Sequence, residues 1–300
     1  MNDISETQNT LESLDLLAAQ RQLYSEAKRL HMISVIICVP LVIVWSILVA
    51  LVPSLSAYAA LWGIVVTALE LLCLSRLQRM MQTKAARIQQ LFDCKVLQFQ
   101  WMNLNCGIRV EPETIIGAAS RYKKNSSCFK LRDWYPVSIK VLPIHQARVI
   151  CQRSNVWWDA QLRRRYARWI ILVLAVLTLA VLLIGLVGGL TLEKLILAIL
   201  IPLLPAFVFG IRQYIEHQEA ADRLDRLRED SESLVQEVIS GRYTSHDLEQ
   251  KSYSLQTQIY DNRLRSPLIL DWLYSQLRDE NEEKMNRGAE VLVQSLTQHP

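Results

Sequence analysis

The sequence lacks the short motifs by which most enzyme families are recognised. It contains no G-x-x-x-x-G-K-[ST] phosphate-binding loop, no H-E-x-x-H zinc motif and no G-x-S-x-G nucleophile motif. Its five histidines are scattered and do not pair at the spacing of metal ligands. We therefore expect no catalytic residues, no metal ligands, no cofactor and no enzymatic activity.

Cysteine usage excludes two further classes of protein. None of the six cysteines forms a C-x-x-C pair, so we expect no zinc site. Two cysteines lie in apolar runs and four lie in polar segments that, by charge, belong in the cytoplasm, where thiols stay reduced. Disulfides are therefore not expected. A cleavable signal peptide is not expected either, because the first apolar run follows some 30 polar residues without a small-x-small cleavage site.

Four apolar runs are the dominant feature that is present. They are Met32–Val52, Ala57–Leu74, Trp169–Leu192 and Leu195–Ile211. Each is close to the roughly 20 residues that a helix needs to cross a bilayer. The fourth is short but becomes a full span if Lys194 extends its ammonium group towards the headgroups. The sequence therefore predicts an integral membrane protein.

The positions of the basic residues predict the orientation of these spans. The link Pro53–Ser56 is uncharged, and the link between the third and fourth runs carries only Glu193 and Lys194. Every other flank is basic, including the Arg163–Arg165 run. The positive-inside rule then places the N-terminus, the middle segment and the C-terminus in the cytoplasm.

The predicted fold class is all-α, with four transmembrane helices arranged as two hairpins and extended into a cytoplasmic helical body. The apolar spacing between Arg76 and Asp93 predicts that the second span continues as a helix, which we expect to end near Asn103, Asn105 and Gly107. Pro143 should begin a helix that enters the third span. The predicted regions are an N-terminal amphipathic cytoplasmic helix (1–31), a first hairpin (32–77, spans 32–52 and 57–77), a cytoplasmic helical region (78–168), a second hairpin (169–211, spans 169–191 and 195–211) and a C-terminal cytoplasmic helical region (212–300), which should contain helices at 212–240, 245–260 and 271–287.

Four residues within the spans are candidates for a pore or a gate. Glu70 is costly at mid-bilayer but lies about one turn from the cytoplasmic end of its span. It could therefore reach the headgroups, line a pore or pair two helices. Pro40, Pro202 and Pro205 free backbone carbonyls and allow kinks, which occur both in gates and in static bundles.

The cytoplasmic segments contain aromatic and hydrogen-bonding residues in an unusual combination. Packing in the helical body is one explanation for them. The other is a ligand site in which tryptophan rings stack on a base and arginine binds phosphate. The candidate ligand-binding residues are Trp134, Tyr135, Gln152, Arg153, Asn155, Trp158 and Arg263.

Several short motifs, in a fixed order around the four spans, carry a resemblance to a known family. They are Gln20–Lys28, Ile88–Asp93, Trp134–Pro136, Cys151–Asn155 with Trp158–Asp159, Leu162–Arg163 and Tyr166, and Ile259–Arg263 with Ser266–Pro267 and Asp271–Tyr274. In these residues the chain resembles the SMODS-associated four-transmembrane effectors, a family described as pore-forming.

The resemblance implies a role in bacterial antiphage defence by cyclic-oligonucleotide-based signalling (CBASS). A neighbouring nucleotidyltransferase would make a cyclic di- or oligonucleotide after infection. This activating ligand would cause the effector, expected to be a homo-oligomer in the bacterial inner membrane, to permeabilise the lipid bilayer and kill or arrest the infected cell. DNA or RNA polymers are not expected as partners. An alternative that the residues leave open is a structural or scaffolding membrane protein that recruits a cytoplasmic partner.

Overall fold

The computed structural model describes residues 2–189 and 191–298. Within these ranges it describes every side chain except those of residues 50, 104, 198 and 272–279. The regular structure of that part of the chain is helical. Its elements are α1 (Ile4–Thr7), α2 (Leu11–Cys38), α3 (Pro40–Leu51), η1 (Pro53–Leu55), α4 (Ser56–Leu69), η2 (Glu70–Leu74), α5 (Ser75–Val96), α6 (Asn103–Cys106), α7 (Pro112–Asn125), η3 (Cys128–Leu131), η4 (Val137–Val141), α8 (Ile144–Val187), α9 (Leu192–Leu195), η5 (Ile196–Leu200), α10 (Ile201–Ile239), α11 (Ser245–Arg265) and α12 (Asp271–Gln298).

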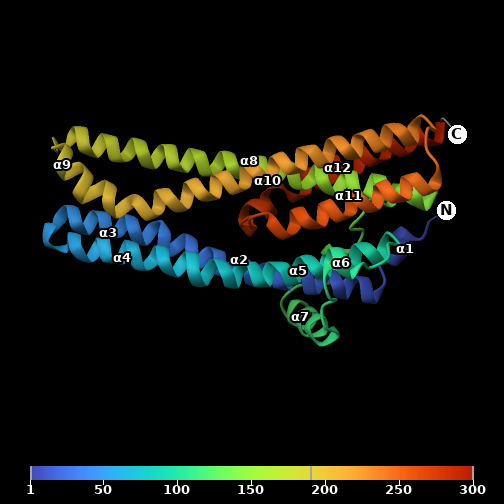
Figure 1. The fold of residues 1–300 in the computed structure, drawn as a ribbon, viewed down its shortest axis with the longest axis horizontal. Coiled ribbons are helices and arrows are strands. Elements are labelled where there is room, and N and C mark those ends of the chain that lie inside the picture. Colours follow the sequence, from blue (N-terminus) through green and yellow to red (C-terminus); the bar gives the residue numbers. More distant parts are fainter. Residues whose placement is uncertain (1, 190, 299–300) are drawn as a thin grey trace.

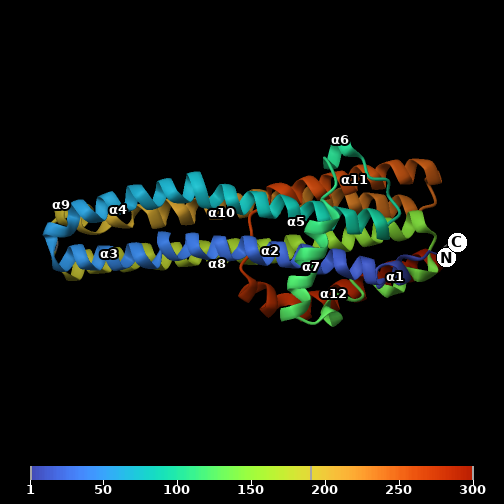
Figure 2. The same cartoon turned by 90° about the horizontal axis from the view of Figure 1, so that it is seen from below.

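The molecule is an elongated helical bundle in which two long hairpins point the same way (Figure 1). The turns after α3 and after α8 lie at one end of the bundle, and the N- and C-terminal segments lie at the other. Helix α8 has 44 residues without a break and is therefore about 66 Å long. Helix α10 packs along it in the opposite direction and also contacts α3 and α4, which joins the two hairpins (Figure 2).

Three stretches of helix are long and apolar enough to cross a membrane: Leu11–Val49, Pro53–Val96 and Ile144–Val187. These overlap the first three predicted spans, although the first stretch ends at Val49 and not at Val52, and the third ends at Val187 and not at residue 191. The fourth, residues 195–211, is not among them. It runs through α9, η5 and the start of α10, returns alongside α8, and exposes the apolar side chains of Leu204, Val208 and Ile211. The all-α membrane fold is thus confirmed, and the fourth crossing stays a prediction.

Local signals explain where several helices begin and end. Thr10 caps α2 by accepting a hydrogen bond from the Ser13 amide, and Thr244 caps α11 by accepting one from the Asp247 amide. Pro112 occupies the first turn of α7, where its missing amide is not needed. Gly241 follows α10 with φ of +65°, a conformation that glycine adopts without strain.

The prolines in the apolar segments have different effects on the backbone. Val39, with φ of −117° and ψ of −75°, interrupts the helix between α2 and α3, and Pro40 begins α3. Pro202 lies in the first turn of α10, directly after the π-helical segment η5, whereas Pro205 lies inside α10. Whether any of them acts as a gate stays a prediction.

Two glycines allow close helix packing, one within the second hairpin and one between the two hairpins. A Cβ atom at Gly210 of α10 would lie 2.7 Å from Cδ2 of Leu174 on α8. One at Gly63 of α4 would lie 3.1 Å from Cγ of Pro205 on α10. Small residues at such contacts let membrane helices approach closely.

The opposite end of the bundle is a compact helical body. The N-terminal half of α2 packs against α5 and α7, and this core includes the fully buried Leu17, Ile88, Phe92 and Ile150. A second core joins α8, α10 and α11, with Val156, Leu224, Val235, Leu248 and Leu255 among its members. The body is therefore built on the same helices that enter the membrane.

Most predicted helices of the body are confirmed, with three errors at boundaries. The helix predicted over 245–260 extends to Arg265. The helix after the second span ends at Val96 and not near Asn103, because Leu97 to Met102 leave the helix and residues 103–106 form the separate α6. The last helix extends to Gln298 and not to Arg287, because Ala289 and Val293 are buried in the core and hold the extra turns. Helix α8 begins directly after Pro143, as predicted.

The four-span topology can be tested by cysteine labelling. We expect a membrane-impermeant maleimide to label Ser54→Cys and Glu193→Cys in intact spheroplasts, because both positions lie at the hairpin turns. Ser126→Cys in the body should be labelled only after permeabilisation. The background would carry Cys73→Ser and Cys128→Ser. The buried thiols should stay silent, since burial raises the pKa of Cys94 to about 12 and that of Cys151 well above its ordinary value.

Labelling of Glu193→Cys only after permeabilisation would contradict the second hairpin.

Candidate functional site

The centre of the helical body is a buried carboxylate with three donors. Asp93 of α5 is completely buried. Its oxygens accept hydrogen bonds from Tyr135 Oη at 2.7 Å, Gln256 Nε2 at 2.9 Å and Arg263 Nη1 at 2.5 Å. These donors come from the loop before η4 and from α11, so one anion joins three segments that are distant in the sequence.

Amide side chains extend this network through the body. Gln256 Nε2 also donates to Gln90 Oε1 at 3.0 Å, and Gln152 Nε2 of α8 donates to Gln256 Oε1 at 3.1 Å. Ser252 Oγ in turn donates to Gln152 Oε1 at 2.8 Å. The motifs at 88–93, 134–136, 151–155 and 259–263 therefore meet in one hydrogen-bonded cluster, which we call the Asp93 network.

Electrostatics favour the donating forms of two members of this network, Tyr135 and Arg263. Burial, together with the Asp93 carboxylate, raises the pKa of Tyr135 well above its ordinary value, so its phenol remains a donor. Burial alone would lower the pKa of Arg263, but the adjacent carboxylate outweighs it and the net shift is upward. Asp93 and Arg263 thus form a buried ion pair in which each charge needs the other.

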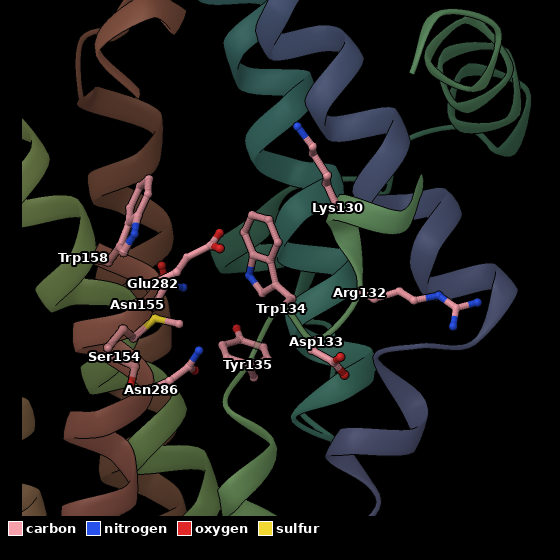
Figure 3. A pocket seen from close by; sticks show the side chains of 11 residues that line it. Lys130, Arg132, Asp133, Trp134, Tyr135, Ser154, Asn155, Trp158, Glu282 and Asn286 are labelled. Atoms are coloured by element: carbon pink, nitrogen blue, oxygen red, sulfur yellow. The ribbon is translucent and has the colours of Figure 1, made fainter. Parts of the chain in front are cut away.

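A pocket lies beside the network, between α8, α12 and the loop that precedes η4 (Figure 3). It encloses about 120 Å³. Figure 3 shows Glu282 of α12 between the indole rings of Trp134 and Trp158, with Arg132 pointing away from them. The lining residues are Lys130, Arg132, Asp133, Trp134, Tyr135, Ser154, Asn155, Trp158, Glu282, Met285 and Asn286.

A second cavity of about 160 Å³ adjoins the first and shares Trp134, Asn155 and Trp158 with it. Its wall is more basic, with Arg21, Lys28, Arg163 and Arg263 among its lining residues. The two cavities together offer aromatic faces for stacking and guanidinium groups for anions, which is the chemistry that nucleotide recognition uses.

The structure brings together four of the seven predicted ligand-binding residues. Trp134, Tyr135, Asn155 and Trp158 all line the first pocket. Arg263 lines the second cavity while its guanidinium binds Asp93.

The other two, Gln152 and Arg153, line neither cavity. Gln152 is fully buried within the Asp93 network. Arg153 points towards α10, where its Nη2 lies 2.6 Å from Glu232. Ligand binding by any of the seven residues stays a prediction.

Sequence reasoning missed the residues that organise the site. Asp93 and Gln256 were not selected, although an acid and an amide on helix faces that are otherwise apolar signal a buried polar cluster. It also missed the contribution of α12, because Glu282, Met285 and Asn286 lie in a segment without a distinctive pattern. Within residues 2–189 and 191–298, no three histidine, cysteine or acidic side chains are placed to hold a metal ion.

A second ion pair, between a buried carboxylate and a half-buried arginine, lies at the apolar end of the body. Glu70, the first residue of the π-helical segment η2, is 6% exposed. The Arg212 guanidinium binds the Glu70 carboxylate through both terminal nitrogens, and Nη1 lies 2.8 Å from Oε2. This geometry corresponds to the alternative in which Glu70 pairs two helices, because the contact joins the first hairpin to the second. A role in lining a pore stays a prediction.

Comparison with known proteins gives two matches. Residues 2–292 match the family model described as the SMODS-associating 4TM effector domain. A protein of Bacillus cereus (strain VD146), described as a probable CBASS effector molecule, is 25% identical over 287 residues, which cover 93% of this chain and 95% of the relative. No solved structure matches the chain.

The Asp93–Arg263 pair should dominate the stability of the body. We expect Arg263→Ala to lower the free energy of unfolding by about 3–5 kcal/mol, because it leaves a buried carboxylate without its counter-charge. The matched control is Lys284→Ala, which removes an exposed i,i+4 pair with Glu280 and should cost less than about 1 kcal/mol. Thermal unfolding of the detergent-solubilised protein, followed by circular dichroism, provides the comparison.

Equal shifts in the unfolding midpoint for the two variants would show that the buried pair contributes no more to stability than the exposed pair.

Proposed function

Because the chain belongs to the family of SMODS-associating 4TM effectors, it is a membrane effector of the CBASS antiphage class, and we propose that a cyclic oligonucleotide activates it through the helical body to permeabilise the bacterial inner membrane. The observation that supports this proposal is the position of the two cavities. They lie on α8, the same unbroken helix that enters the membrane.

Recognition would combine stacking and charge. A base would stack on Trp134 or Trp158, and phosphate groups would bind the basic side chains of the second cavity, with Arg163 and Arg263 among them. The cavities enclose about 120 and 160 Å³, less than the roughly 300–1,000 Å³ of sites for small molecules. The ligand must therefore displace part of the wall.

Helix α12 is the wall element best suited to move. It contributes Glu282, Met285 and Asn286 to the pocket, and it follows a non-helical segment after α11. Glu282 holds a negative charge beside the tryptophan rings, where an incoming phosphate would repel it. Ligand binding would thus exchange a carboxylate of the protein for phosphate groups of the signal.

Transmission to the membrane follows from the continuity of the helices. A shift of α8 or α10 in the body changes the tilt of the same helices within the bilayer. Reversing a closed-to-open ratio from 99:1 to 1:99 requires about 5.5 kcal/mol of differential binding. Base stacking at roughly 1–3 kcal/mol per base and two or three charged hydrogen bonds reach this range.

The open state would be assembled from several copies of the chain. The membrane-spanning helices expose apolar side chains, among them Leu61, Ile64, Val173 and Val176. Glu70, the ionisable residue well inside the predicted spans, is already paired with Arg212. A single copy therefore offers no polar stripe for ions, and permeation requires contacts between copies or disruption of the surrounding lipid.

The stacking role can be tested in cells that co-express an active cyclic-oligonucleotide synthase. We expect the wild-type protein to depolarise the membrane only with the active synthase, as read by a voltage-sensitive dye. Trp158→Ala should reduce the sensitivity to the nucleotide about tenfold or more, because base stacking is lost. Trp157→Ala is the matched control, since it removes the neighbouring indole, which lines neither cavity.

Equal loss in both tryptophan variants would argue against a stacking site. Absence of depolarisation with every synthase tested, despite verified membrane insertion, would favour the scaffolding alternative.

The Glu70–Arg212 pair should hold the resting state closed. We expect Arg212→Gln to cause depolarisation without any synthase, because it leaves the buried Glu70 carboxylate without its counter-charge. That loss costs about 3–5 kcal/mol, enough to shift the closed-to-open ratio by about 100-fold. The charge-reversed double variant, Glu70→Arg with Arg212→Glu, should restore closure. Arg265→Gln, which breaks an exposed pair with Asp261, serves as the control.

If the Arg212→Gln protein is inserted at normal levels but causes no depolarisation without a synthase, the Glu70–Arg212 pair does not hold the resting state closed.

A further inference from the structure

A large cavity lies between the hairpins and the body, away from the pocket lined by Trp134 and Trp158, which we call the tryptophan pocket. It encloses about 760 Å³ between α2, η2, α5 and α10. Its lining includes the Glu70–Arg212 pair, Gln213 and Glu216 on one side and a series of basic residues of α5 on the other. These basic residues are Arg76, Arg79, Lys84 and Arg87.

The cavity lies at the depth of lipid headgroups. Exposed apolar side chains continue along α5 to Leu77 and Met80, and along α10 to Ile211 and Ile215. These residues alternate with the basic residues that line the cavity. A cavity where apolar surface gives way to basic surface opens towards the membrane–water boundary.

The charge of the cavity favours an anion. Glu70 and Arg212 neutralise each other, and Arg87 interacts with the Tyr260 hydroxyl. The single carboxylate of Glu216 is then outnumbered by the three other basic side chains of α5 that line the cavity. Arg76 and Arg79 are exposed, and neither forms an ion pair or hydrogen bond within the part of the chain that the structure describes. Arg79 has the Glu216 carboxylate as a charged neighbour, without a direct ion pair. Two exposed guanidinium groups that are free of direct ion pairs suit a phosphate group.

A buried amide in the wall also needs a partner. Gln213 is only 7% exposed, and its Oε1 atom accepts no hydrogen bond from the described residues. A buried acceptor without a donor is unfavourable, so a ligand that carries a donor gains from entering the cavity. The cavity therefore combines anion-binding groups near its mouth with an acceptor in its wall.

We propose that this cavity binds the headgroup of an anionic phospholipid, with its phosphate on Arg76 and Arg79 and a headgroup hydroxyl donating to Gln213 Oε1. Phosphatidylglycerol has both groups. The bound lipid would lie beside the Glu70–Arg212 pair, where it could stabilise the contact between the hairpins. The proposal concerns the resting protein and does not depend on nucleotide binding.

Native mass spectrometry of the detergent-solubilised full chain tests the proposal. We expect one phosphatidylglycerol molecule to be retained at least about tenfold more strongly than phosphatidylcholine. Arg79→Gln should weaken retention about tenfold, because a charge-assisted hydrogen bond is lost. Arg168→Gln, an exposed arginine at the cytoplasmic end of the third span and outside the cavity, should change it less than twofold.

A second variant tests the role of the hydroxyl. Gln213→Leu should weaken retention of phosphatidylglycerol and leave phosphatidylmethanol, which has the phosphate but no headgroup hydroxyl, unaffected. Equal losses in Arg79→Gln and Arg168→Gln would overturn the proposal in favour of a diffuse basic belt. Displacement of the lipid by millimolar inorganic phosphate would assign the cavity to free phosphate, and no retained lipid in the wild-type protein would reject the site.

Discussion

The buried ion pair between Asp93 and Arg263 is the constraint on which the arrangement of the helical body depends. A charge with no exposure to solvent is tolerable only with its counter-charge and further donors, so α5, α11 and the loop carrying Tyr135 must meet at one point. Once they meet there, α8 is fixed through Gln152, and the tryptophan pocket forms beside it. A polar requirement thus positions apolar helices that could otherwise pack in several registers.

The architecture could be predicted from the sequence because the bilayer imposes strong rules. Runs of about 20 apolar residues and the asymmetry of Lys and Arg led to the two hairpins, and Pro143 and Gly241 marked helix ends through backbone geometry alone. The partners of polar residues could not be predicted. Nothing local indicates that Arg153 pairs with Glu232 whereas Arg263 pairs with Asp93, since both choices depend on how distant helices rotate relative to each other.

The same reason explains the uneven outcome for the candidate site. Trp134, Tyr135, Asn155 and Trp158 line one pocket, yet the motifs that carry the family resemblance meet mainly in the buried network. Gln152 and Arg263 therefore have a role in the assembly of the body that sequence inspection reads as ligand recognition. The contribution of α12 was missed because it comes from the packing of a helix whose own sequence is ordinary.

The unbroken course of α8 makes the register between its two parts rigid. No flexible linker separates the part of α8 in the helical body from its apolar part, so the two parts cannot turn independently of each other. Inserting one residue near Arg168 would rotate one half by about 100° relative to the other and misalign every contact beyond it. The number of residues between Trp158 and Leu174 therefore matters to the fold independently of their side-chain chemistry.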